Sequence, residues 1–122
     1  MRYVKVTGDE SGGSRFEDAE VVQTGTLYSE NTPPVLVSSA IPATGLAFVT
    51  VPPDVRETGR HPSPRRQFVV ILDGEFELET TDGDRRRFRP GDVLLVEDLE
   101  GRGHVTRALT DGPASFAAIP LA

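Results

Sequence analysis

The stretch "HPSPRRQFVVILDG" (residues 61–74) joins a proline-rich polar segment to five consecutive apolar residues. A short run of β-branched and aromatic residues that ends at Asp-Gly predicts a strand. Because side chains alternate between the two faces of a strand, the odd-numbered positions should share one face. On that face we expect His61, Ser63, Gln67, Val69 and Ile71.

The next segment predicts a hairpin with one buried and one wet face. In "EFELETTDGDRRRFRP" (residues 75–90), apolar residues alternate with glutamates before an Asp-Gly turn, and arginines follow the turn. Across such a hairpin Glu77 and Glu79 should lie opposite Arg85 and Arg87 as cross-strand ion pairs. The arginine run is therefore predicted to be structural.

The rest of the chain predicts more short strands and no helix. Twelve Gly and ten Pro interrupt almost every helix-length window. Residues 16–23 fit either a strand or one helical turn, and we favour a strand. Strands at near-regular spacing with Gly and Pro between them predict an antiparallel barrel or sandwich. The expected strands cover residues 2–7, 16–23, 34–39, 44–52, 68–72, 92–98, 103–110 and 114–121.

Composition narrows the class of protein. The chain has 122 residues, which is the length of one domain, and its net charge of −6 argues against a nucleic-acid partner. It has no cysteine, which excludes disulfides, thiolate metal sites and cysteine nucleophiles. The longest apolar run is too short to span a bilayer. We expect a cytoplasmic protein with no membrane role.

The two histidines, His61 and His104, are the main clue to chemistry. His61 precedes one central strand, and His104 lies early in another, where it should share a face with Thr106 and Ala108. If both faces line the interior of a barrel, two imidazoles and the Gln67 carboxamide converge in its mouth. A barrel mouth is a usual place for a small-molecule site.

The spacing of these residues resembles that of the cupin superfamily of small β-barrels. The first cupin motif has His-x-His, three or four residues, Glu, six residues and Gly; residues 61–74 keep that spacing, with Gln67 before Gly74. The second motif has a Pro-Gly-Asp-like turn, a strand and a His; here Pro90-Gly91-Asp92 leads to His104. The resemblance implies an all-β, cupin-like double-stranded β-helix (jelly-roll) barrel. It implies a single cupin domain over residues 1–122, with the motifs near 59–74 and 90–108.

The same resemblance implies an altered metal site. Metal-binding cupins hold iron, manganese, nickel, zinc or copper with three His and one Glu. By position, His61 and His104 stand for two of the His ligands, Ser63 replaces another, and Gln67 replaces the Glu. Two imidazoles and an amide leave the charge of a divalent cation uncompensated. The nearest carboxylates in sequence, Glu97 and Asp98, belong to a lengthened turn. The resemblance thus implies either one weakly held ion on His61, Gln67 and His104, or no metal.

Other readings of these residues stay open. His61 could be an exposed loop residue, His104 a hydrogen-bonded structural one, and Gln67 a partner of backbone groups. Ser63, between two prolines, should form a turn. Arg65 shares the inward parity and, with Gln67, is a candidate to bind substrate, clamping an anionic group. Three aromatic residues are expected in the core: Tyr28, Phe48 and Phe116.

The apolar run at residues 68–72 also predicts a partner. Val69 and Ile71 face the core, so Phe68, Val70 and Leu72 should face out of the sheet. A strand that is apolar on both faces needs cover on both. The outer face should be covered by the N-terminal segment or by a second subunit, and we favour a homodimer.

Two functional hypotheses follow. The first is a small-molecule-binding cupin that acts as a divalent-metal-dependent enzyme of the isomerase, lyase or dioxygenase type. In it His61 or His104 is a general acid/base or a metal ligand. The second is a metal-free, non-catalytic module for ligand binding or dimerisation. Cupins host many activities, so the resemblance indicates fold more than reaction.

Overall fold

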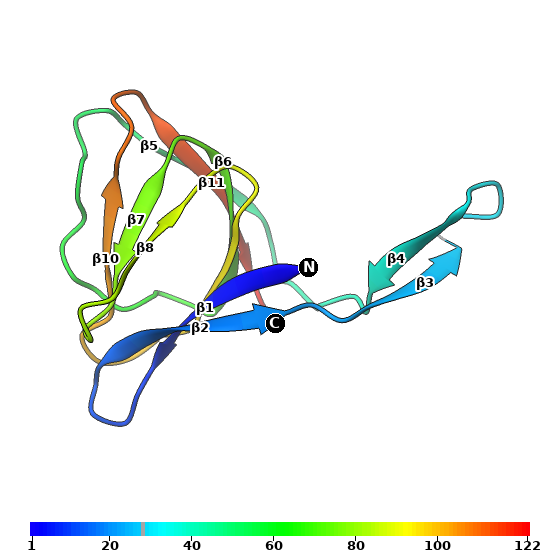
Figure 1. Ribbon diagram of the computed structural model, residues 1–122. Helices are drawn as coiled ribbons and strands as arrows, with labels where there is room; N and C mark the ends of the chain where they lie inside the picture. Colours follow the sequence, from blue (N-terminus) through cyan, green and yellow to red (C-terminus); the bar gives the residue numbers. More distant parts are fainter. Residues whose placement is uncertain (28) are drawn as a thin grey trace.

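The computed structural model describes residues 1–27 and 29–122, which form strands and loops (Figure 1). Within this part of the chain there is no helix, and therefore none that could cross a membrane. The strands are β1 (Arg2–Gly8), β2 (Ser14–Glu20), β3 (Gln23–Leu27), β4 (Pro34–Ser38), β5 (Ala47–Val51), β6 (Gln67–Asp73), β7 (Phe76–Glu79), β8 (Arg85–Phe88), β9 (Val93–Val96), β10 (Val105–Ala108) and β11 (Ala114–Pro120).

One wall of the body is a six-stranded sheet in the order β2-β1-β9-β6-β11-β5. Its pairs are antiparallel except β1 and β9, which run parallel. The predicted antiparallel pairing therefore holds for every pair of this sheet except that one. A parallel pair needs a long connection, and most of the chain separates these two strands.

The opposite wall is a three-stranded sheet in the order β10-β7-β8. Residues 56–61 extend it along the free side of β10, where the Thr58 amide donates to the Thr106 carbonyl (2.9 Å) and the Ala108 amide donates to the Arg56 carbonyl (2.9 Å). The two walls face each other as in the expected jelly roll (Figure 1). The prediction of an all-β fold is confirmed.

Apolar side chains from both walls meet between the sheets. Phe76 and Leu94 are each 1% exposed, and Phe76 stacks edge-on against Phe116 with ring centroids 5.7 Å apart. Burial of one such side chain stabilises a fold by about 1.5–3 kcal/mol. The expected core position of Phe116 is confirmed, because it packs against the buried cluster. Tyr28 lies outside the described residues.

Phe48 is not a core residue. It is 75% exposed, so the expectation that it lies in the core is wrong. β5 pairs with β11 so that Phe48 lies opposite Ala117, which in turn lies opposite Val70 of β6. These residues share the outer face of the six-stranded sheet, whereas Val49 faces the interior. The aromatic side chain therefore follows the alternation of its strand.

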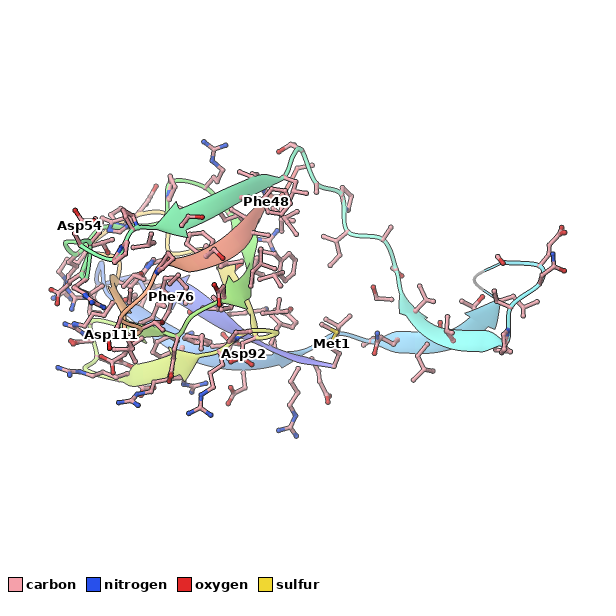
Figure 2. All side chains as sticks on the ribbon, turned by 90° about the horizontal axis from the view of Figure 1, so that it is seen from above. Met1, Phe48, Asp54, Phe76, Asp92 and Asp111 are labelled. Atoms are coloured by element: carbon pink, nitrogen blue, oxygen red, sulfur yellow. The ribbon has the colours of Figure 1, made fainter. Side chains whose placement is uncertain are left out.

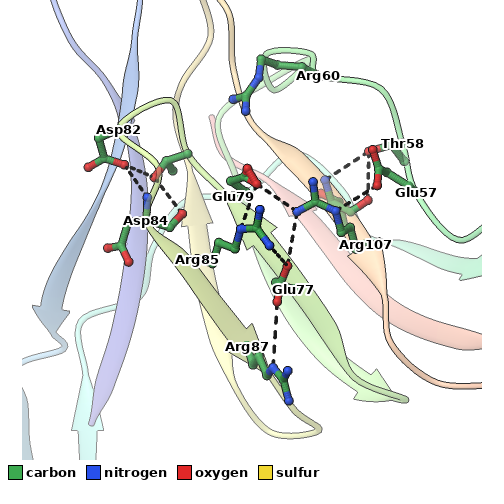
Figure 3. Close-up of polar contacts among 12 residues, drawn as sticks. Glu57, Thr58, Arg60, Glu77, Glu79, Asp82, Asp84, Arg85, Arg87 and Arg107 are labelled. Atoms are coloured by element: carbon green, nitrogen blue, oxygen red, sulfur yellow. Dashed lines mark hydrogen bonds and ion pairs between the residues drawn. The ribbon is translucent and has the colours of Figure 1, made fainter.

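The predicted hairpin is confirmed with its register. Glu77 lies opposite Arg87 and Glu79 opposite Arg85, and the Arg85–Glu79 pair has a 3.1 Å contact (Figure 3). Arg107 of the neighbouring strand β10 contacts both glutamates, at 3.3 and 3.2 Å. Arg85, Arg87 and Arg107 thus balance the two glutamates on the outer face of the three-stranded sheet.

The third sheet is a hairpin that projects from the body. β3 and β4 pair with each other and with no other strand of the described chain. We call residues 21–27 and 29–46 the arm. Figures 1 and 2 show it extending away from the two walls. β4 was predicted, but β3 was not, because "QTGTL" has no apolar run; the strand expected at 16–23 ends at Glu20.

Candidate functional site

A cavity of about 520 Å³ lies between the two walls. This volume is within the usual range of small-molecule sites, which is about 300–1,000 Å³. Most of its lining is aliphatic or aromatic, and Phe76, labelled in Figure 2, lies inside the body as part of it. Its polar side chains come from seven residues: Thr58, His61, Ser63, Arg65, Gln67, His104 and Thr106.

The structure brings the two histidines together at this cavity. His61 and His104 pair as a β-bridge: the His61 amide donates to the His104 carbonyl at 3.1 Å, and the His104 amide donates to the His61 carbonyl at 3.0 Å. Their ring centroids are 5.5 Å apart. His61 is exposed and His104 is buried, so one imidazole is at the opening and the other is deeper.

Gly103 makes this pairing possible. Its φ is +71°, a conformation that L side chains rarely adopt, and a Cβ at this position would overlap the backbone of His61. The chain therefore needs glycine directly before His104. The sequence shows a glycine here, but only the contact between Gly103 and the His61 backbone explains why no other residue fits.

The hydrogen bonds of the two imidazoles indicate where their protons lie. The Nδ1 atom of His61 is 2.7 Å from the carbonyl oxygen of Gly59. The Nδ1 atom of His104 is 2.6 Å from an Asp98 carboxylate oxygen. A carbonyl or an ionised carboxylate only accepts, so Nδ1 is the protonated nitrogen of both neutral rings. Each ring is left with Nε2 as its free acceptor.

Asp98 belongs to this candidate site through its contact with His104, which the sequence did not reveal. It is fully buried, and the second oxygen of its carboxylate, Oδ1, has no hydrogen-bond partner among the described residues. Its backbone carbonyl accepts the Ser63 amide at 3.0 Å, which ties the two loops together. The sequence showed Asp98 only as a carboxylate in a lengthened turn. That turn folds back so that Asp98 reaches His104, six residues further along the chain.

The other predicted site residues occupy three different settings. Ser63 forms the expected turn, because its hydroxyl donates to the Arg65 carbonyl at 2.8 Å. Gln67 is half-buried, begins β6 and lines the cavity. Arg65 is exposed at the opening and also lines it, whereas Arg66 pairs with Glu97 at 3.0 Å.

The residues at the cavity do not fit a firmly held divalent metal ion. No group of three His, Cys, Asp or Glu side chains in the described chain is arranged to hold one. The donors available are two neutral imidazoles and one carboxamide, which bring no negative charge to the ion. Asp98 is occupied by the Nδ1 atom of His104, behind the ring. We therefore derive no chemical step through a metal.

A second hollow is less suited to be a site. It is a groove of about 650 Å³ bordered by β1, β2 and β8. One of its arginines, Arg86, is paired with Asp18 of the same lining at 2.7 Å. Arg86 also lies over the ring of Phe16, 5.1 Å from the ring centroid. The groove thus resembles a solvated ion-pair surface.

Comparisons with known proteins agree with this architecture. The profile of the Cupin domain family matches residues 47–120. A Cupin 2 conserved barrel domain protein from Salinispora arenicola CNS-205 is 19% identical, with a TM-score of 0.50 over 82% of this chain and 74% of that one. A cupin domain from Bordetella pertussis Tohama I is 20% identical, with a TM-score of 0.50 over 85% of this chain and 97% of that one. No curated protein matches. At such identities the structural likeness shows the fold alone.

Proposed function

This chain belongs to the cupin domain family, and we propose that it binds a small, mostly apolar molecule and transfers a proton on it with His104. The observation that carries the proposal is the buried Asp98–His104 pair at an apolar cavity. The cavity does not support metal-dependent chemistry, because its possible metal donors include no charged ligand and no group of three His, Cys, Asp or Glu among the described residues.

The shape of the site supports the class of ligand. Its walls are apolar along their length, with contributions from β5, β6, β9 and β11, while its polar groups gather around the histidines. A ligand with an apolar body and one polar end matches this division. A carbonyl or carboxylate end suits the site, because the exposed Arg65 guanidinium and the Gln67 carboxamide can both donate hydrogen bonds to oxygen.

His104 is the better base of the two histidines. Asp98 accepts the Nδ1 proton, which fixes the tautomer and leaves the lone pair of Nε2 free. When Nε2 takes a proton from the ligand, the buried carboxylate stabilises the imidazolium that forms. His61 is held by a neutral carbonyl and reaches solvent, so it can exchange protons with water. After its Nε2 has taken up a proton from water, it can pass that proton to the ligand.

Binding can be tested with the two histidines as reporters. We expect 4-phenylbutyrate, which has an apolar body and a carboxylate, to shift the imidazole NMR signals of the wild type. Val49→Trp should abolish the shifts, because Val49 lines the cavity. Thr50→Trp is the matched control, because Thr50 is the next residue and is exposed. Shifts that persist in folded Val49→Trp would place binding elsewhere.

Proton transfer can be tested separately. We expect the wild type to accelerate exchange of the α-protons of 4-phenyl-2-butanone for solvent deuterium. Loss of a general base costs about 10²-fold or more, so His104→Ala should lose most of the acceleration. Proton loss to His104 and return of a deuteron balance the reaction without a cofactor. Binding without any acceleration would refute the catalytic part of the proposal.

That outcome would leave a second candidate function, a non-catalytic ligand-binding module. It is favoured by the small number of groups in the cavity that can move protons, which are His61 and His104 alone among its described lining residues. The carboxamide of Gln67 would then orient the ligand by hydrogen bonds.

A further inference from the structure

The arm exposes apolar side chains on a hairpin that the body does not cover. Leu36 is 67% exposed and Leu27 is 62% exposed, and both belong to the same face of the hairpin, since Leu27 pairs with Pro34 and Leu36 with Gly25. Ile41 is half-exposed on the segment that returns to the body. Figure 2 shows the arm extending away from the body, with side chains in the open.

A two-stranded hairpin of this kind is marginally stable in water by itself. Three or more strands, or packing against another surface, are needed to make such a structure stable. Leucine, valine and isoleucine side chains gathered on one projecting hairpin also form an apolar surface of the kind that marks an interaction site. The arm therefore requires a partner surface.

The charge of the arm narrows the chemistry of that partner. Glu30 is the single charged residue between Val21 and Leu46, in a chain that carries 32 charged residues in all. With no Lys or Arg, the arm has nothing to attract phosphate groups of nucleic acid or anionic lipid. The partner surface should be apolar and uncharged.

This chain itself presents such a surface, on the outer face of the six-stranded sheet. Phe48 and Leu72 are exposed there, and Phe68 stacks edge-on against Tyr3 with centroids 5.6 Å apart. The segment that leads from β4 to Phe48 also carries exposed apolar side chains, those of Ile41 and Leu46.

The two edge strands of that sheet differ in charge. The edge strand β2 carries four charged residues, which discourage another strand from adding to it. The edge strand β5, "AFVTV", carries none. The unprotected edge is thus the one that adjoins the exposed Phe48 and the arm.

We propose that the partner is a second copy of this chain, with each arm packed on the outer face of the other copy's six-stranded sheet beside β5. A two-fold pair covers both arms and both outer faces at once, because the same surface of each copy is used. Each arm then holds the other copy, and the cavity between the two walls of each copy stays open. The interface is separate from the proposed ligand site.

The mass in solution gives the first test. Light scattering at micromolar concentration should give twice the 13.2 kDa of one chain. The double variant Leu27→Asp/Leu36→Asp should give the single mass with an unchanged β-sheet circular dichroism spectrum, because neither side chain packs in its own body. The control Thr24→Asp places a charge on the opposite face of the same hairpin and should leave the dimer intact. A monomeric wild type, or a dimer that survives the double variant, would overturn the proposal.

A cross-link identifies the surface that the arm contacts. We would place the photo-reactive residue p-benzoylphenylalanine at position 36 of an unlabelled chain and mix it with ¹⁵N-labelled wild type. The proposal predicts a cross-link from the light arm to a heavy peptide from β5 or β6. Cross-links only within the light chain, or only between two arms, would contradict it.

Discussion

Phe76 in the body and Leu36 in the arm are both large apolar residues in strands, yet the first is 1% exposed and the second is 67% exposed. Phe76 lies between two walls that come from the same chain. Leu36 lies on β4, which pairs with β3 and with no other strand of the described chain. The contrast shows that an apolar strand residue is buried only where other parts of the chain supply a surface to cover it.

The body and the arm should differ most in how much stability is lost when a large apolar side chain is shortened to alanine. Phe76→Ala should lower the free energy of unfolding by about 3–5 kcal/mol, because it opens a void beside Phe116. Leu36→Ala should act mainly by weakening the pairing of two copies, so its cost should depend on protein concentration. Urea unfolding at several protein concentrations measures both. A concentration-independent loss of similar size in Leu36→Ala would mean that the arm packs on its own body.

Substitutions at two glycines test the same contrast between the body and the arm. Gly103→Ala should destabilise the body by about 2 kcal/mol or more, because the new Cβ overlaps His61 and φ is positive. It should also separate the two imidazoles. Gly45→Ala in the arm, outside its paired strands, should be neutral or slightly stabilising, because nothing lies within 4 Å of the added Cβ. Thermal unfolding of the two variants gives the test, and equal destabilisation would contradict the contrast.

The smallest expected effect comes from the turn of the body hairpin. A hydrogen bond from the Thr80 hydroxyl, followed by the Asp84 amide, lowers the pKa of Asp82 below its usual 3.8. A lowered folded-state pKa adds stability above 3.8, and this stability is lost as pH falls through the folded value. Asp82→Ala should therefore lower the unfolding temperature slightly at neutral pH, and the difference should shrink in acid. A difference that grows in acid would be inconsistent with this assignment.

Much of the body could be predicted from alternation and turn residues. The hairpin of β7 and β8, its register and the inward face of β6 follow from period-two patterns in the sequence. The shape of the arm could not be predicted in this way. β3 is a strand because it pairs with β4, and its own residues carry no strand pattern.

The site was predictable only where it depends on the alternation of side chains along a strand. His61, Gln67 and His104 line one cavity, as their parity indicated. The link between Asp98 and His104 depends on how the turn at residues 99–102 folds, which local patterns do not report. The exposed position of Phe48 also depends on strand register. Both features come from contacts between segments that are distant in sequence or separated by irregular chain.

The assignment of His104 as the base rests on its tautomer, and ¹⁵N NMR of the two imidazoles measures this tautomer directly. We expect His104 in its neutral form to carry its proton on Nδ1 and to have an unprotonated Nε2. In Asp98→Ala, which removes the acceptor of the Nδ1 proton, His104 should lose its preference for this tautomer, while His61 keeps its own pattern. A wild-type His104 protonated on Nε2, or a tautomer preference unchanged in Asp98→Ala, would contradict this assignment.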